Sequence, residues 1–437
     1  MENKDKSNSC LKTKNKCFCI ALLFVLMCSM PSVLYAYSAS GPNTYRCISL
    51  SDCQNAVDAS PTGWTVEIAD GSYTWHAPLI IDKGITFKGE TSQNTVTIHN
   101  GYSNSDWKNT QGVITITENS SSSIEISDIT FISASGASNS IHIGVNGTAD
   151  GKPVKIHDCV FKTGSYDMWS SIRMATNRGI IYNNTFTASG MTDNAICLKY
   201  APSSSWTTAS TMGTDDSDGT HNVYIEDNTF NEHLHECIDM DSYSRVVIRH
   251  NTFNDSGITS HGLCTSSAST RHWEIYDNNF HFVDGMSNGN GYRDYYIFLR
   301  GGSGVITGNN FDSAPDNKLE IKWADYAIQR ASCGQYPGGA CSDTTYPTVQ
   351  QMGQGHDGSG YITEKFYIWG NSGDNDFGPD DYQDECGNGL TVSQFVQLHR
   401  DFELSAKPGW VRYPYPHPLR NGAPGDSLDP PKNLHLN

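Results

Sequence analysis

The sequence predicts an all-β fold, a right-handed parallel β-helix with an N-terminal cap helix and an irregular C-terminal cap. The first observation is a phrase that occurs five times: Ile, two residues, Asn, one residue, Phe. The second is its interval, because successive Asn residues from Asn228 to Asn309 are 23, 27 and 31 residues apart. Repeats of this length, rich in β-branched residues, Gly and Asn, suit coils of two or three short strands. The five copies are Ile181-Asn184-Phe186, Ile225-Asn228-Phe230, Ile248-Asn251-Phe253, Ile275-Asn278-Phe280 and Ile306-Asn309-Phe311.

The phrase has a direct physical meaning in a stack of coils. Alternate residues of a strand share a face, so Ile248 points inward with Val246, and Arg249 points outward. Stacked coils place each Ile on the next, and each Phe returns to the core after the turn. Asn tolerates left-handed backbone and bonds locally, and stacked amides can bond one another. A β-sandwich with recurring Asn-Thr-Phe turns is the alternative fold.

Residues 1–36 have the layout of a secretory signal peptide. Five lysines precede an apolar run from Cys17 to Met30, and Leu34-Tyr35-Ala36 follows as a cleavage site. The run is short for a membrane span, although an uncleaved anchor is the alternative. We therefore expect a protein that is secreted, extracellular or periplasmic.

Charge excludes several kinds of partner. Removing residues 1–36 takes the formal net charge from −18 to −21, because the segment holds five Lys and two acidic residues. Nucleic acids and anionic membranes need basic surface, so neither is expected as a partner. A polyanionic substrate would need bound cations or a local basic groove.

Nine cysteines follow the signal segment. Cys47 with Cys53, and Cys333 with Cys341, are close enough in sequence for local disulfides in an oxidising compartment. Cys159 stands where a ladder Asn is expected and is predicted to be an inert core thiol. No Cys-x-x-Cys pair is present, which argues against structural zinc.

The rest of the chain divides into a cap, a periodic body and a tail. Residues 37–63 form the N-terminal cap, with helical spacing at Cys53, Ala56 and Val57. The β-helix takes residues 64–372, with loops at 200–220 and 325–360 that either grip a ligand or are solvated insertions. Residues 373–437 are predicted to be a C-terminal cap packed along the coil.

Several segments together resemble a known superfamily. They are Trp64-Thr-Val-Glu-Ile-Ala-Asp-Gly-Ser-Tyr73, Lys83-Gly-Ile-Thr-Phe-Lys-Gly89, the Asn-Thr-Phe coils and Tyr415-Pro-His-Pro-Leu419. They resemble secreted bacterial right-handed β-helix proteins of the pectin-lyase-like superfamily, over residues 45–420. The resemblance implies the fold. It implies no single chemistry, because the superfamily holds lyases, hydrolases, esterases and non-enzymes.

A second strand can be aligned after each Phe, and its outward residues form two columns about 4.8 Å apart from coil to coil. One column is Cys197, Asp239, Cys264, Phe298 and Glu320. The other is Lys199, Asp241, Ser266, Arg300 and Lys322. The sequence thus predicts a stripe with an acidic centre and basic flanks.

The first mechanism for this stripe is β-elimination from a uronate polymer. Asp239, Asp241 and Glu320 would hold calcium, which prefers carboxylate oxygens and would neutralise the uronate. Lys199, Arg300 or Lys322 would supply the base or a charge-neutralising group. Solvated salt bridges with little energetic weight are the alternative.

The second mechanism is hydrolysis, implied by a resemblance to polygalacturonases. Thr192-Asp193, His235-Glu236, Ser260-His261-Gly262 and Glu320-Ile-Lys322 follow that family's order, although His235 and Glu320 replace an expected Asp and Arg. The resemblance makes Glu236 the acid, Asp193 the base, His261 an orienting partner and Lys322 a grip on the substrate carboxylate.

A third interpretation is carbohydrate binding or an envelope structural role without catalysis. Another outward row could stack on sugar rings, with Trp206 and Trp410 nearby in sequence. Its members are His157, Tyr182, Glu226, Arg249, Tyr276 and Trp369. Of the three, the sequence favours a monomeric lyase that cleaves a uronate-containing polysaccharide with the help of calcium.

Overall fold

The computed structural model divides into two units, Met1–Ala36 and Tyr37–Asn437. It describes residues 37–421 except 103–111, 118–121, 134–138, 144–151, 164–169, 189–193, 200–215, 234–236, 242, 261–268, 282–294, 313–320, 324–345, 348–349, 357–358, 374–376 and 380–390. The proposed signal segment, and most of the two predicted loops, lie outside this part of the chain. Among the described residues, none of the helices has the length and apolar character needed to cross a membrane.

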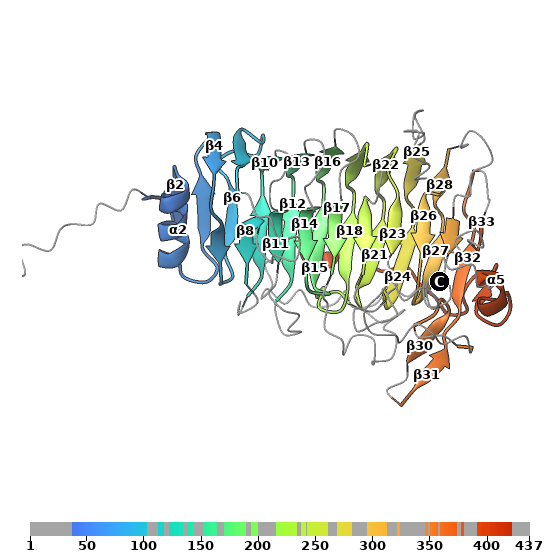
Figure 1. Ribbon diagram of the computed structural model, residues 1–437. Helices are drawn as coiled ribbons and strands as arrows, with labels where there is room; N and C mark the ends of the chain where they lie inside the picture. Colours follow the sequence, from blue (N-terminus) through green and yellow to red (C-terminus); the bar gives the residue numbers. More distant parts are fainter. Residues whose placement is uncertain are drawn as a thin grey trace, which may run out of the picture. The chain divides into compact units, whose positions relative to one another are not determined.

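Three stacked sheets build the fold, and successive strands of the chain visit them in turn (Figure 1). Within each sheet the neighbours are parallel, except that β1 pairs antiparallel with β2. The predicted right-handed parallel β-helix is confirmed. Sheet A holds β1 (Ser38–Gly41), β2 (Thr44–Cys47), β3 (Thr65–Ile68), β6 (Thr86–Gly89), β9 (Ile124–Ser127), β12 (Val154–His157), β15 (Gly179–Tyr182), β18 (Val223–Glu226), β21 (Arg245–Arg249), β24 (His272–Tyr276), β27 (Ser303–Thr307), β32 (Phe366–Trp369) and β34 (Phe402–Glu403).

The other two sheets carry the Phe of each repeat and the stripe. Sheet B holds β4 (Gly71–Trp75), β7 (Val96–Asn100), β10 (Ile129–Ser133), β13 (Val160–Thr163), β16 (Thr185–Ala188), β19 (Thr229–Asn231), β22 (Thr252–Asn254), β25 (Asn279–His281) and β28 (Asn310–Phe311). Sheet C holds β5 (Leu79–Ile81), β8 (Gly112–Ile116), β11 (Asn139–Ile143), β14 (Ser170–Met174), β17 (Asn194–Leu198), β20 (Ile238–Met240), β23 (Ile258–Ser260), β26 (Ile297–Leu299), β29 (Ile321–Trp323) and β33 (Phe377–Pro379).

The repeated Asn residues form a continuous amide ladder between sheets A and B. The Nδ2 of Asn228 donates to Oδ1 of Asn251 at 3.0 Å, and Asn251 donates in the same way to Asn278 at 3.0 Å. The ladder runs from Asn184 to Asn371. Each Oδ1 from Asn228 onward also accepts the main-chain N–H of the preceding ladder Asn, and that of Asn184 accepts the N–H of Cys159. These bonds satisfy buried polar groups in every turn, so they fix the vertical registry of the coils.

The left-handed residue of each turn is the one before the ladder Asn, which differs from the expectation that Asn itself takes this conformation. Positive φ angles occur at Asn183, Asp227, His250, Asp277 and Gly308. The ladder Asn keeps ordinary backbone because its role is carried by the side chain.

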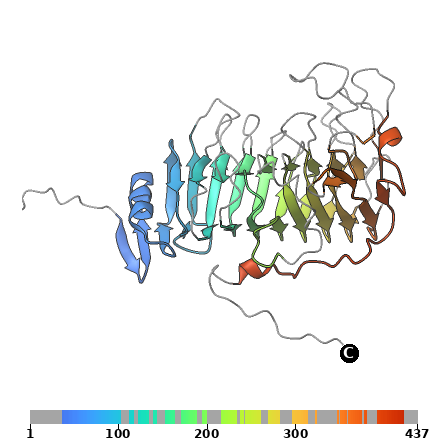
Figure 2. The ribbon, with the colours of Figure 1, turned by 90° about the horizontal axis from the view of Figure 1, so that it is seen from below.

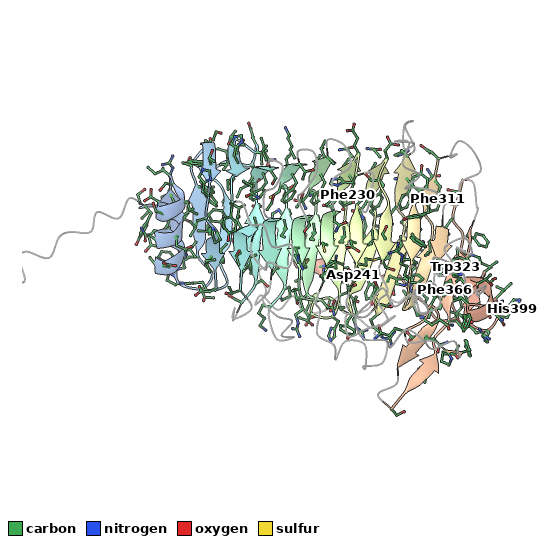
Figure 3. The ribbon with its side chains drawn as sticks, viewed as in Figure 1. Phe230, Asp241, Phe311, Trp323, Phe366 and His399 are labelled. Atoms are coloured by element: carbon green, nitrogen blue, oxygen red, sulfur yellow. A yellow bond between two sulfur atoms is a disulfide. The ribbon has the colours of Figure 1, made fainter. Side chains whose placement is uncertain are left out.

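The Phe residues form a stacked column on the inner face of sheet B. Neighbouring rings from Phe131 to Phe311 lie 4.7–5.1 Å apart and nearly parallel. Figure 3 labels Phe230 and Phe311 from this column. Apolar burial of this kind is the main stabilising contribution to such a core.

The N-terminal end of the solenoid is closed by α2 (Leu50–Ala59), as the cap prediction requires. Ser49 caps the helix by accepting from the Asp52 N–H, and Cys47 forms the predicted disulfide with Cys53. Cys159 is buried, and burial raises the pKa of its thiol, as expected for an inert core residue. The predicted Cys333–Cys341 pair lies outside the described residues.

At the C-terminal end lies α5 (Val392–Phe395), and the antiparallel pair β30 (Gln354–His356) and β31 (Tyr361–Thr363) projects away from the stacked coils (Figure 1). From there the chain turns back. Residues 407–421, which we call the strap, run along the outer face of sheet A and end in the short 3-10 helix η1 (Pro418–Arg420) (Figure 2).

The strap corrects one sequence-based expectation. The outward row of sheet A exists in the predicted order, but Glu226, Arg249 and Tyr276 are fully buried. Arg249 donates to the main-chain oxygens of Tyr413 at 2.8 Å and Pro414 at 2.6 Å. These three positions therefore do not offer an open surface for sugar rings, because the strap covers them; Tyr413 is 164 residues from Arg249 in sequence.

Candidate functional site

The candidate site is the outer face of sheet C, where strand register decides which side chains meet. Asp239 pairs with Cys197 on one side and with Thr259 on the other, and Thr259 pairs with Phe298. Arg173 extends the same column at its N-terminal side. We call this column, together with Lys199, Asp241 and Arg300 at the following positions, the sheet C stripe.

Two parts of the predicted alignment were wrong. The strand after β20 is Ile258–Ser260, so Thr259 occupies the position assigned to Cys264. In the last coil β29 (Ile321–Trp323) pairs Lys322 with Phe298, whereas the predicted alignment placed Lys322 beside Arg300. The reason is packing: the observed register puts the Trp323 ring into the core, 5.5 Å from Phe366 and 5.0 Å from Phe402.

The centre of the stripe is an ion-paired group of three side chains. The ammonium of Lys199 lies 3.0 Å from Oδ2 of Asp239 and 3.2 Å from Oδ2 of Asp241. The Asp239 side chain is fully buried, whereas the side chains of Lys199 and Asp241 are 19% and 10% exposed. Lys199 and Asp241 are therefore the members of this group that solvent can reach, and the buried Asp239 carboxylate binds the Lys199 ammonium from the protein side. Figure 3 labels Asp241.

Asp239 is itself held by its neighbours on β17. Asn194 Nδ2 donates to Asp239 Oδ2 at 3.3 Å, and the Cys197 thiol lies 4.0 Å from the same oxygen. The main-chain N–H groups of Ala195 and Ile196 both donate to the Cys237 oxygen, which is a bulge-like pairing. Both Ala195 and Ile196 belong to the core, so the bulge allows Asn194 to reach Asp239 on the outer side.

Electrostatics fix the protonation of this group. Burial alone would lower the pKa of Lys199, but the charges of Asp239 and Asp241 outweigh it and raise that pKa well above its usual value. Lys199 is therefore an ammonium at neutral pH and cannot act as a general base there. Burial also raises the pKa of Cys197 to about 12, so this thiol is not a nucleophile.

Arg300 lies two coils further along the stripe. Its guanidinium carbon is 4.4 Å from the centre of the Phe298 ring, and its main-chain N–H donates to Ser260 Oγ at 2.7 Å. An Arg stacked on an aromatic ring is pre-organised for a carboxylate. From Arg173 on β14 to Arg300 after β26 the stripe crosses four coil steps, about 19 Å at the usual strand spacing.

The remaining predicted site residues are not placed. Asp193, Glu236, His261 and Glu320 lie outside the described residues, and for Lys322 only the main chain in β29 is described. Their roles stay predictions.

The predicted calcium site at Asp239 and Asp241 is shaped by the side chain that lies between them. Between Asp239 and Asp241, the Lys199 ammonium already occupies the position where a cation would sit. One other group in the described part of the chain has potential ligand atoms within 4.8 Å of one another: Asp216, Asp218 and His221. There the buried Asp216 carboxylate already accepts from the main-chain N–H groups of Thr220, His221 and Asn222 and from Tyr224 Oη. These hydrogen bonds stabilise the turn at residues 216–222, and we assign no metal to the Asp216 group.

Sequence reasoning missed two members of the stripe, Arg173 and Thr259, and the hydrogen-bond donor Asn194 that contacts Asp239. Arg173 was detectable, because Ile172 and Met174 repeat the inward spacing of Ile196 and Leu198 one coil earlier. Asn194 and Thr259 gave no signal, since a bulge and a shifted strand bring them to Asp239.

These observations define a class: the chain is a right-handed parallel β-helix protein with a charged stripe on one sheet. No protein-family model matches the sequence, and the comparison with curated proteins finds no match. Among solved structures the chain is similar to an alginate lyase from Paenibacillus sp. str. FPU-7, with a TM-score of 0.41 and 13% identity over 77% of this chain and 97% of that one.

It is also similar to a mannuronan C-5 epimerase A-module from Azotobacter vinelandii, with a TM-score of 0.41 and 11% identity over 79% of this chain and 89% of that one. For the catalytic domain of a GH87 α-1,3-glucanase in complex with nigerose, the TM-score is 0.32 and the identity 10%, over 85% of this chain and 69% of that one. Similarity at this level carries no argument about activity, and the fold rests on the strand pairing of this chain.

Proposed function

We propose that the chain is a secreted carbohydrate-active enzyme that cleaves a uronate-containing polysaccharide by β-elimination at the sheet C stripe. The observation that carries the proposal is the Lys199 ammonium held between Asp239 and Asp241, with Arg173 and Arg300 on either side along the column. This is a local concentration of cationic groups on a chain whose formal net charge is −18.

Elimination makes three demands. The uronate carboxylate must be neutralised, the proton on C5 removed, and the C4 oxygen protonated as its bond to C4 breaks and the C4–C5 double bond forms. Arg300, stacked on Phe298, is suited to the first demand, and the protonated Lys199 to the third. The base is to be sought among His261, Asp193 and Glu236.

Hydrolysis fits the described residues less well. It needs one carboxylic acid and one free carboxylate. Asp239 and Asp241 share one ammonium, and Asp239 is out of contact with solvent. Calcium remains part of the proposal as the alternative charge-neutralising cation, with Lys199 as the resident cation of the site.

The test is a screen of the purified chain on pectate, alginate and neutral glycans, with calcium or with a chelator. Elimination yields an unsaturated product that absorbs in the ultraviolet, whereas hydrolysis yields reducing ends without that chromophore. Lys199→Met should lower the signal by roughly 10²-fold or more, and Lys199→Arg should retain more of it. Lys162→Met, which replaces an exposed cation on β13, is the matched control. New reducing ends without the chromophore would overturn elimination, and no product on any uronate polymer would overturn the proposal.

A further inference from the structure

The end of the strap is held by a histidine whose two ring nitrogens have opposite roles. His417 Nε2 lies 3.1 Å from the main-chain oxygen of Asp216, which can only accept, so Nε2 carries the proton. The main-chain N–H of Leu419 donates to Nδ1 at 3.2 Å, so Nδ1 must be unprotonated. Both bonds together require the neutral imidazole, in one tautomer.

The surroundings of His417 are buried and contain cations. The residue is 1% exposed, and its ring lies 3.9 Å from the ring of Tyr224. Burial and then the charge of Arg249 are the main causes that lower the pKa of His417 to about 3. Arg420 acts in the same direction, and the hydrogen bond to the Asp216 main chain and the charge of Asp218 oppose it. Glu226 also faces it, but its oxygens are engaged by Arg249, Arg420 and the His417 main-chain N–H.

The same end of the strap is seated against a glycine. A Cβ on Gly219 would lie 2.1 Å from Leu419 Cδ1, and Gly219 has a φ of +63°. Leu419 and Tyr413 pack with Ile180, Tyr182 and Tyr224 in a small apolar cluster separate from the solenoid core. Arg420 lies over the Tyr182 ring at 4.4 Å. This end therefore docks as a unit onto β15, β18 and the turn at residues 216–222.

We propose that residues 416–421 are an acid-sensitive latch, closed while His417 is neutral and released when Nδ1 takes up a proton. A proton on Nδ1 would face the Leu419 N–H, break the cap of η1 and add a third cation beside Arg249 and Arg420. Release uncovers the ring of Tyr182, which belongs to the outward row of sheet A, and the neighbouring ring of Tyr224. The latch does not depend on the proposed activity.

The direction follows from linkage. The closed state holds the pKa of His417 below its value of about 6.5 in an open strap, so the closing free energy is present above that value and is lost as the pH falls. The opening equilibrium should rise roughly tenfold or more between pH 7 and pH 5. Two other groups at the strap titrate: Glu274, which accepts from Trp410, in the opposite sense, and His250, whose ring lies 3.7 Å from that of Tyr415 and whose pKa is lowered by burial, in the same sense. The measurement is therefore made in a background that carries both Glu274→Gln and His250→Asn.

The experiment is hydrogen exchange of peptides covering residues 412–421 in the full chain, corrected for the intrinsic pH dependence of exchange. His417→Asn keeps an acceptor for the Leu419 N–H but does not titrate, so its protection should be the same at pH 7 and pH 5. Gly219→Ala should open the latch at both pH values. Gly409→Ala, which has a φ of +72° and nothing within 4 Å of the added Cβ, should not.

Two results would overturn the latch. One is equal protection of residues 412–421 at pH 7 and pH 5 with His417 in place. The other is an unchanged pH dependence in His417→Asn. If that variant does not fold, the imidazole resonances of His417 decide: a ring that is protonated at pH 5 while the strap remains protected contradicts the proposal.

Discussion

The outer faces of sheets A and C carry the same kind of side-chain column but differ in what covers them. On sheet A, Arg249 and Glu226 form an ion pair in which both side chains are fully buried under the strap. On sheet C, Lys199 and Asp241 keep part of their surface in contact with solvent. The sheet A ion pair is structural, because it is fully buried and the N–H groups of Arg249 donate to protein groups. On sheet C the buried Asp239 holds Lys199, a cation that solvent and therefore a ligand can reach.

The strongest test of this difference is to break the sheet A pair. Arg249→Met leaves the Glu226 carboxylate buried with fewer donors, and it removes the two bonds that hold the strap at Tyr413 and Pro414. We expect the free energy of unfolding to fall by about 3–5 kcal/mol, the usual cost of breaking a buried pair. Urea unfolding of the full chain measures it.

The control is Arg46→Met, which breaks a more exposed pair with Glu90 and should cost at most about 1 kcal/mol. Similar losses for Arg249→Met and Arg46→Met would show that the strap does not bury a structural ion pair.

The second test separates activity from stability on sheet C. If the stripe is the active site, Lys199→Met should lower kcat/KM on the uronate substrate by roughly 10²–10³-fold, because a preorganised charge facing the transition state is lost. Asp239→Asn should act indirectly. It removes the largest influence that raises the pKa of Lys199, so that pKa should fall.

The readout is the rate at which an amine-reactive reagent labels Lys199 as a function of pH, measured by mass spectrometry. Labelling at an unchanged pH midpoint in Asp239→Asn would contradict the anchoring role of Asp239, whatever the enzyme's substrate.

The third test concerns Glu274, a carboxylic acid under the strap. Burial raises the pKa of Glu274 to about 7, and Trp410 Nε1 donates to its Oε2 at 3.1 Å. A raised pKa favours the folded state while the group is protonated, so this contribution is complete below about pH 4.5 and is lost as the pH rises through 7. Glu274→Gln removes the titration but keeps an acceptor for Trp410.

We expect the stability of the wild-type chain relative to Glu274→Gln to decrease by about 2–3 kcal/mol between pH 4.5 and pH 8. Parallel unfolding curves of the two chains across that range test it. A constant difference would mean that Glu274 is already ionised in the fold.

The smallest expected effect is that of chelation. Because the Lys199 ammonium stands between Asp239 and Asp241, EDTA should change the activity less than twofold. A large loss that calcium restores would assign the neutralising charge to the metal and would point to carboxylates such as Glu320.

Some of this architecture is readable from local sequence. A one-residue slip in any coil would turn its Ile and Phe outward, so the phrase Ile-x-x-Asn-x-Phe fixes both register and fold. The same argument failed in the last coil. Leu319-x-Ile321 and Ile321-x-Trp323 alternate equally well, and packing of Trp323 against Phe366 and Phe402 selects the second.

By itself, then, the sequence determined the solenoid, its Asn ladder, the cap helix and the disulfide, because each depends on contacts between neighbouring residues or equivalent positions of adjacent repeats. Only the tertiary structure decided which outward column stays accessible. Arg412 meets Asp277 across 135 residues and His417 meets Asp216 across 201, and no periodicity in the chain encodes such a return. Contacts between adjacent coils follow one sequence pattern that every repeat carries. The strap instead makes one set of long-range contacts, and the surface that it binds exists only when the coils are stacked.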